Sequence, residues 1–176
     1  MANQTLRLIS SEAELMLDAC AGQRTIAGAT DVFSNISSDF KNWATDVPGK
    51  ATPETPVAVY ELAEDATFTR MFRSLENDEW KLVLQQDQVL NFVEKYRNWL
   101  RRHDWATFFL LQVGGKLKPF VTRVYVRSDH TLGTHIYQFR HGRVWSTRIR
   151  LSLVVPILRQ SYDGQVSGQA TIVAAH

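Results

Sequence analysis

ATFFLLQV, residues 106–113, is the stretch from which the fold of this chain can best be predicted. Its central residues, Phe108 to Leu111, are all large and apolar, and the side chains of a strand alternate between its two faces. Both faces are therefore apolar, which is typical of a strand that is covered on two sides. We expect a central strand of a sheet at this position.

The residues that follow predict a meander of antiparallel strands. Gly114-Gly115 is a two-residue hairpin signal, and Pro119 limits strand pairing close to that turn. The next segment, Lys116–Arg127, alternates apolar and polar residues, as a half-buried strand does. Further strands are expected at 134–139, 144–155 and 170–173, joined by turns at 128–130, 140–143 and 163–164.

Upstream of the central strand, a long helix is expected over residues 87–102. Asp87 is its expected N-cap, and an apolar stripe follows at helical spacing: Val89, Phe92, Val93, Tyr96, Trp99 and Leu100. A shorter helix is predicted over residues 65–75, where Phe68, Met71, Phe72 and Leu75 share one face. Strands are predicted on either side of that helix, at 57–62 and 80–84.

The N-terminal segment is expected to be helical. Ser11 and Glu14 have the spacing of a capping box, which predicts a helix over residues 11–21. A second helix is predicted over residues 30–43 from the apolar positions Val32, Phe33, Ile36, Phe40 and Trp43. Residues 44–56, rich in proline, are expected to form a linker. This divides the chain into a helical segment, 1–46, and a core domain, 57–176, unless residues 1–176 form one continuous domain.

The predicted fold class is thus α+β, with N-terminal helices and then a long helix packed on a four- to five-stranded antiparallel meander sheet. That arrangement occurs in proteins of many functions, so function has to be inferred from particular residues.

Charge is divided unequally between the two halves of the chain. Residues 1–90 carry 7 Lys/Arg and 14 Asp/Glu, a net charge of −7, whereas residues 91–176 carry 13 Lys/Arg and 4 Asp/Glu, a net charge of +9. The basic half is therefore expected to meet an anionic partner, or the acidic half of the same chain.

The candidate binding site is a basic face of the sheet. Its residues are expected to project from the outer face of neighbouring strands: Arg123, Tyr125, Arg127, Arg148 and Arg150. Nucleic-acid-binding proteins combine cations that neutralise phosphates with planar groups that stack on bases. The alternative is that these arginines are only the solvated side of a half-buried sheet. A secondary basic cluster, Arg97, Arg101 and Arg102, is also explained by the helix dipole, which favours cations in the last turn.

No catalytic residue, metal site or cofactor is predicted. The lone Cys20 excludes an intrachain disulfide and is expected to be a small core residue, while His130, His135 and Asp129 lack the spacings of common zinc sites. His103 and Asp104 are neighbours along the chain, which does not make them an acid–base pair.

The cysteine content, together with the lack of a signal sequence or a long apolar run, leads us to expect a cytoplasmic protein that does not span a membrane. Three functions are left open, and the first is a non-enzymatic module that binds nucleic acid or another polyanion through the basic face. The second is an assembly module, in which an acidic protein or a second copy of the chain docks by charge complementarity. The third is an enzyme with a small-molecule pocket and no recognisable motif.

Overall fold

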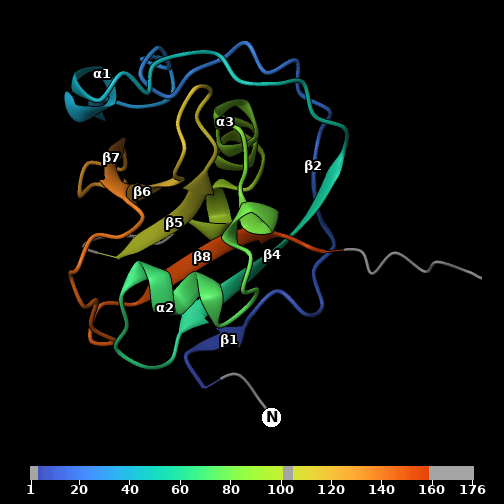
Figure 1. Cartoon of the computed structure of the whole chain (residues 1–176), viewed down its shortest axis with the longest axis vertical. Coiled ribbons are helices and arrows are strands. Elements are labelled where there is room, and N and C mark those ends of the chain that lie inside the picture. Colours follow the sequence, from blue (N-terminus) through green and yellow to red (C-terminus); the bar gives the residue numbers. More distant parts are fainter. Residues whose placement is uncertain (1–3, 101–104, 159–176) are drawn as a thin grey trace, which may run out of the picture.

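The computed structural model describes residues 4–100 and 105–158 (Figure 1). It is dominated by one eight-stranded mixed sheet, in the order β1-β4-β8-β5-β6-β7-β3, with β2 also paired to β4. The strands are β1 (Leu6–Leu8), β2 (Leu15–Leu17), β3 (Asn35–Ile36), β4 (Thr55–Leu62), β5 (Ala106–Leu111), β6 (Phe120–Val126), β7 (Leu132–Gln138) and β8 (Leu151–Pro156). The described helices are short: α1 (Asp39–Asn42), α2 (Phe68–Arg73) and α3 (Gln86–Lys95), with 3-10 turns at Glu79–Leu82 and Arg97–Trp99.

The predicted fold class is therefore wrong in its main features. The sheet is larger than expected and is not an antiparallel meander, because β5 pairs with β8 in parallel and β3 pairs with β7 in parallel. Only the part from β5 to β7 follows the predicted meander: β5 pairs with β6 and β6 with β7, both antiparallel, and the 114–115 and 128–130 turns are present on either side of β6.

The prediction for the central strand β5 is confirmed. It lies between β8 and β6, and all six of its residues are buried. Phe108 and Leu110 belong to one hydrophobic core cluster, whereas Phe109 and Leu111 belong to the other. The sheet is thus the middle layer of the molecule, with one core on each face.

Different elements cover the two faces of the sheet. Figure 1 shows α2 on one side and α3 on the other. The α2 side is built around Phe68, which packs edge-on against Phe108 with ring centroids 5.0 Å apart. The α3 side is built around Phe92, whose ring centroid lies 5.4 Å from that of Phe109.

The two N-terminal helices predicted over residues 11–21 and 30–43 are wrong. Residues 15–17 form strand β2, with Leu15 and Leu17 buried, and pair with Val57 and Thr55 of β4. Within 30–43, only Asp39–Asn42 is helical, and β3 pairs with β7. In both segments, tertiary packing on the sheet overrides local propensity. The division at residues 44–56 stays a prediction, although strands on both sides of it share the sheet.

Helix α3 is shorter than the predicted helix 87–102. Its N-cap is Gln85, which forms a capping box with Gln88, so Asp87 lies inside the first turn and is not the cap. The helix ends at Lys95, because the backbone of Tyr96 (φ −123°) leaves the helical conformation, and a 3-10 turn follows. The helix predicted over 65–75 is present but is also shorter, Phe68–Arg73, and of its predicted apolar face Phe68, Met71 and Phe72 are in the helix and buried.

The first turn of α3 is polar, yet it is buried, because it holds the loops that surround it. The side chain of Gln86 accepts a hydrogen bond from Ile26 N (2.9 Å) and donates to the carbonyl oxygens of Thr45 (2.8 Å) and Val47 (3.0 Å). Asp87 accepts a hydrogen bond from Gly22 N at 2.9 Å. The N-terminal loops are thus attached to α3 by hydrogen bonds to their main chain.

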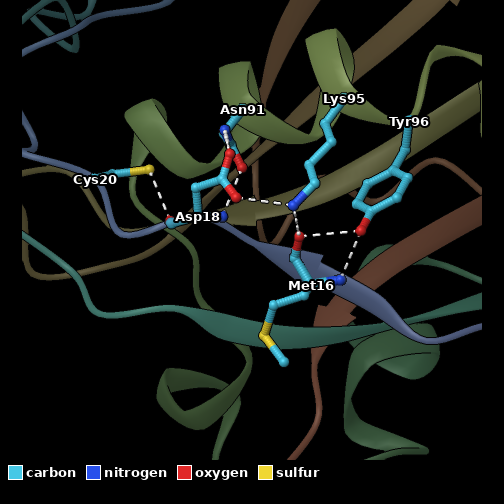
Figure 2. Close-up of polar contacts among 6 residues, drawn as sticks. All are labelled: Met16, Asp18, Cys20, Asn91, Lys95 and Tyr96. Atoms are coloured by element: carbon cyan, nitrogen blue, oxygen red, sulfur yellow. Dashed lines mark hydrogen bonds and ion pairs between the residues drawn. The ribbon is translucent and has the colours of Figure 1, made fainter.

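One edge of β2 pairs with β4, and side chains from the end of α3 cover the other edge (Figure 2). Tyr96 Oη accepts a hydrogen bond from Met16 N (2.8 Å) and donates one to Met16 O (3.0 Å). Lys95 Nζ donates to Met16 O and to the Asp18 carboxylate, at 2.9 and 2.8 Å, while Asn91 and Asp18 are joined by two further hydrogen bonds. Hydrogen bonds from Lys95 and Asn91 lower the pKa of Asp18. Side chains of α3 therefore take the place of a further strand at this edge.

The predicted strands at 80–84 and 144–155 need correction as well. Residues 79–82 form a 3-10 turn, and the last described strand, β8, begins only at Leu151. It does not form a hairpin with β7 but lies between β4 and β5. Trp145 is nevertheless buried, because it packs among Phe68, Phe108 and Tyr137. The predicted strand at 170–173 and its turn lie outside the described residues. No helix in the described ranges is long and apolar enough to cross a membrane.

Candidate functional site

Most of the cations that form ion pairs lie in the first half of the chain. Within the described residues, ion pairs with carboxylates involve Arg7, Arg24, Arg70, Arg73, Lys81 and Lys95. No such pair is found in the described ranges for the cations further along the chain: Arg97, Lys116, Lys118, Arg123, Arg127, Arg140, Arg143, Arg148 and Arg150. The acidic half therefore does not neutralise the arginines of the predicted basic face by direct contact.

The five residues of that face come from two separate parts of the fold. Arg123 and Tyr125 lie in β6, and Arg127 is exposed in the turn that follows. Arg148 and Arg150 lie in the loop before β8, which is separated from β6 by the whole of β5. The prediction that they belong to a neighbouring strand is wrong, because β8 starts late and pairs elsewhere.

Arg148 and Arg150 have contacts of their own. The guanidinium of Arg150 lies 5.1 Å from the centroid of a Trp105 ring. Arg148 contributes to the low pKa of Asp65, which is set mainly by hydrogen bonds from the backbone and the hydroxyl of Thr147. The contacts of both arginines are thus with residues outside β6.

Only part of the secondary basic cluster can be described. Arg97 lies in the 3-10 turn after α3 and donates a hydrogen bond from Nη2 to the carbonyl oxygen of His130 at 2.5 Å. This contact joins the end of α3 to the turn between β6 and β7. Arg101 and Arg102 lie outside the described residues, as do His103 and Asp104.

Arg123 and Tyr125 form a cluster with His135 and Gly133, which we call the β6–β7 patch. Strand alternation places Arg123 and Tyr125 on the same face of β6 as the buried Val121, and in the sheet register Arg123 pairs with His135 and Tyr125 with Gly133. The Arg123 guanidinium carbon lies 5.1 Å from the Tyr125 ring centroid. The rings of Tyr125 and His135 are stacked, 5.4 Å apart and inclined by 15°.

Arg123, Tyr125 and His135 are each half-buried. The Nε of Arg123 is inaccessible to solvent and has no hydrogen-bond partner within the described part of the chain. Burial, together with the positive charge of Arg123, lowers the pKa of His135, while Asp39 has the opposite, smaller effect. His135 is therefore mainly neutral near pH 7, and its Nε2 lies 3.3 Å from the Tyr125 hydroxyl.

The histidines do not converge on a metal site. His130 lies exposed in the turn, with a backbone φ of 66°, whereas the ring of His135 lies on Tyr125. Among the described residues there is no group of three or more His, Cys, Asp or Glu side chains that could hold a metal ion. Cys20 is not the helical core residue that was predicted: it is only half-buried, and burial raises the pKa of its thiol.

A cavity that was not predicted lies at the other end of β6. Its volume is about 470 Å³, and its lining combines the aromatic rings of Trp80 and Phe120 with the charged groups of Glu79, Lys118 and Arg140. Its only carboxylate, Glu79, is already paired with Arg73. The described lining therefore offers no pair of free carboxylates for acid–base chemistry.

Two members of the β6–β7 patch, Gly133 and His135, were missed as partners of Arg123 and Tyr125. The signal was present in the sequence, because the predicted turn at 128–130 is closed by Arg127 and Thr131. Counting four residues away from the turn along each strand, from Arg127 and from Thr131, pairs Arg123 with His135. A glycine inside a strand is in addition a sign that something approaches the backbone closely.

Comparisons of the chain with protein-family models, with curated proteins and with solved structures found no match.

Proposed function

We propose that this chain is a non-enzymatic binding module that contacts nucleic acid or a related polyanion through the β6–β7 patch, with Arg127 at its end. The observation that supports this proposal most strongly is the state of Arg123. Its guanidinium lies beside an aromatic ring, has no carboxylate partner in the described chain, and carries an Nε–H without an acceptor.

An unpaired guanidinium of this kind favours an anionic ligand for two reasons. A phosphate oxygen neutralises its charge, and it can accept hydrogen bonds from the terminal nitrogens of the guanidinium. The contact with the Tyr125 ring holds the guanidinium in place before a ligand arrives, which reduces the entropy lost on binding.

The other cations around β6 and β7 add to the positive electrostatic field of Arg123. Arg127 is exposed at the end of β6, and Arg140 and Arg143 follow β7, all without an ion pair in the described ranges. Such a field raises the local concentration of a polyanion and makes its affinity depend steeply on salt.

The test is a titration of the protein against a fluorescein-labelled single-stranded oligonucleotide, followed by fluorescence anisotropy over a series of salt concentrations. We expect binding that weakens as salt rises, and a loss of several-fold in Arg123→Gln, with the salt slope falling by about 0.7, the value for one phosphate contact. The matched control is Arg70→Gln in α2, which removes the same charge from an exposed pair with Glu64. The proposal fails if the wild-type chain does not bind at low salt, or if both variants lose affinity equally.

A further inference from the structure

We infer that the β6–β7 patch binds the unpaired bases of a single-stranded nucleic acid, with Gly133 as the residue that positions Tyr125 for stacking. This inference rests on the proposed function and names its ligand class. A double helix and a base-free polyanion would also satisfy the charges of the patch, so only its planar groups distinguish a single strand from them.

Three planar groups lie together on one strip of the sheet. The guanidinium carbon of Arg123 lies 5.1 Å from the ring centroid of Tyr125. The ring centroid of His135 lies 5.4 Å from that of Tyr125, and these two rings are within 15° of parallel. Unpaired bases stack on such groups, whereas the bases of a duplex are stacked inside it and a polyphosphate has none. The planar composition therefore favours a single strand.

Gly133 determines where the Tyr125 ring lies. A Cβ at position 133 would be 2.3 Å from Cζ, 2.4 Å from the hydroxyl oxygen and 2.6 Å from Cε2 of that ring. The end of the ring thus occupies the space of a missing side chain, and any other residue there would displace it. Gly133 has no positive φ that would itself require glycine, so the space is the reason.

The strip continues along the same face of β7. Tyr137, two residues beyond His135, points to the same side, and its ring centroid lies 5.7 Å from that of the exposed His141. Beyond it, the exposed Arg143 lies with its guanidinium 4.1 Å from a ring centroid of the buried Trp145. His141 and Arg143 thus add one planar and one cationic exposed group next to Tyr137, which suits a ligand of more than one nucleotide.

The test compares three probes at one salt concentration: an oligothymidylate of about twelve nucleotides, a duplex of the same length, and polyphosphate as a competitor. We expect the single strand to bind at least tenfold more tightly than the duplex. Gly133→Ala and Tyr125→Leu should each weaken single-strand binding at least fivefold, which is the smallest loss expected when one base no longer stacks on an aromatic ring. Tyr125→Phe keeps the ring and should stay within about twofold of wild type.

Gly142→Ala is the matched control, because a Cβ at that exposed position would have nothing within 4 Å. It should leave all three affinities unchanged. If Gly133→Ala does not fold, as judged by circular dichroism, Tyr125→Leu still tests the stack. The inference is overturned if duplex or polyphosphate competes as well as the single strand, or if Tyr125→Leu binds normally; in that case the proposed polyanion binding stands. If no probe binds at all, the proposed function itself fails.

Discussion

Replacing Gln86 by methionine should destabilise the whole protein, because one side chain at the start of α3 holds three loop main-chain groups. Gln86 is 2% exposed, and methionine has nearly the same length, so the Gln86→Met variant removes hydrogen bonds without leaving a large cavity. It leaves Ile26 N and the carbonyl oxygens of Thr45 and Val47 without these partners.

The expected loss follows from the burial of those three groups. Ile26 and Thr45 are fully buried, whereas Val47 is 37% exposed and its carbonyl can be hydrated. Two buried groups left unsatisfied at about 1–3 kcal/mol each predict a loss of about 2–6 kcal/mol in the free energy of unfolding. That is a large fraction of the roughly 5–15 kcal/mol that stabilises a typical domain.

Urea unfolding followed by tryptophan fluorescence and circular dichroism measures this loss. The control is Gln23→Met, the same chemical change at an exposed position, which should cost less than about 0.5 kcal/mol. The reasoning is refuted if Gln86→Met is as stable as the control variant. A second, separate transition would show instead that the loops unfold independently of the sheet.

Other perturbations test the edge of β2 and the β6–β7 patch. Tyr96→Phe removes both hydrogen bonds to Met16 and should cost about 1–2 kcal/mol in the same urea assay; a loss within error would show that the edge does not need them. The lowered pKa of His135 means that the unfolded chain binds a proton more readily than the folded chain, so stability should fall as pH drops below about 6.5. His135→Gln should reduce that fall between pH 7.5 and 5.5, and an unchanged pH profile would contradict the assignment. For Asp18, whose pKa is lowered, the stabilisation is present above about pH 4 and lost below it, so an Asp18→Asn variant should lose less stability than wild type on acidification.

Where local sequence and tertiary structure agree, the elements could be predicted. The apolar run Phe108–Leu111 is typical of a strand buried on both faces, and the α2 stripe fits one helical face packed on a core. The β6–β7 hairpin could also be predicted, because its turn residues lie between two alternating segments.

The N-terminal segment could not be predicted, because its fold depends on residues far away in the sequence. Leu15 and Leu17 fit either a helix or a strand, and their pairing with β4, about forty residues later, decides for a strand. The polar run Gln85–Gln88 carries no apolar signal, yet all four of its residues are buried because each bonds to a loop or to the cap of α3.

The candidate site was predicted in part. Arg123 and Tyr125 share a face, as their alternation indicated, but Arg148 and Arg150 were assigned to an adjacent strand on the assumption that consecutive strands pair. A parallel neighbour such as β8 leaves no turn signal between itself and β5, so its position could not be inferred from the order of segments along the chain.

The position of β8 also bears on how the chain folds during synthesis. Without it, β1, β2 and β4 would form one piece of sheet and β5, β6 and β7 another, because β8 alone pairs with both β4 and β5. The sheet can therefore close only after residue 156 has left the ribosome, and until then the apolar edges of β4 and β5 stay unpaired. Closure across such long sequence separations is slow, and nascent chains stalled before β8 should be the species most prone to aggregate.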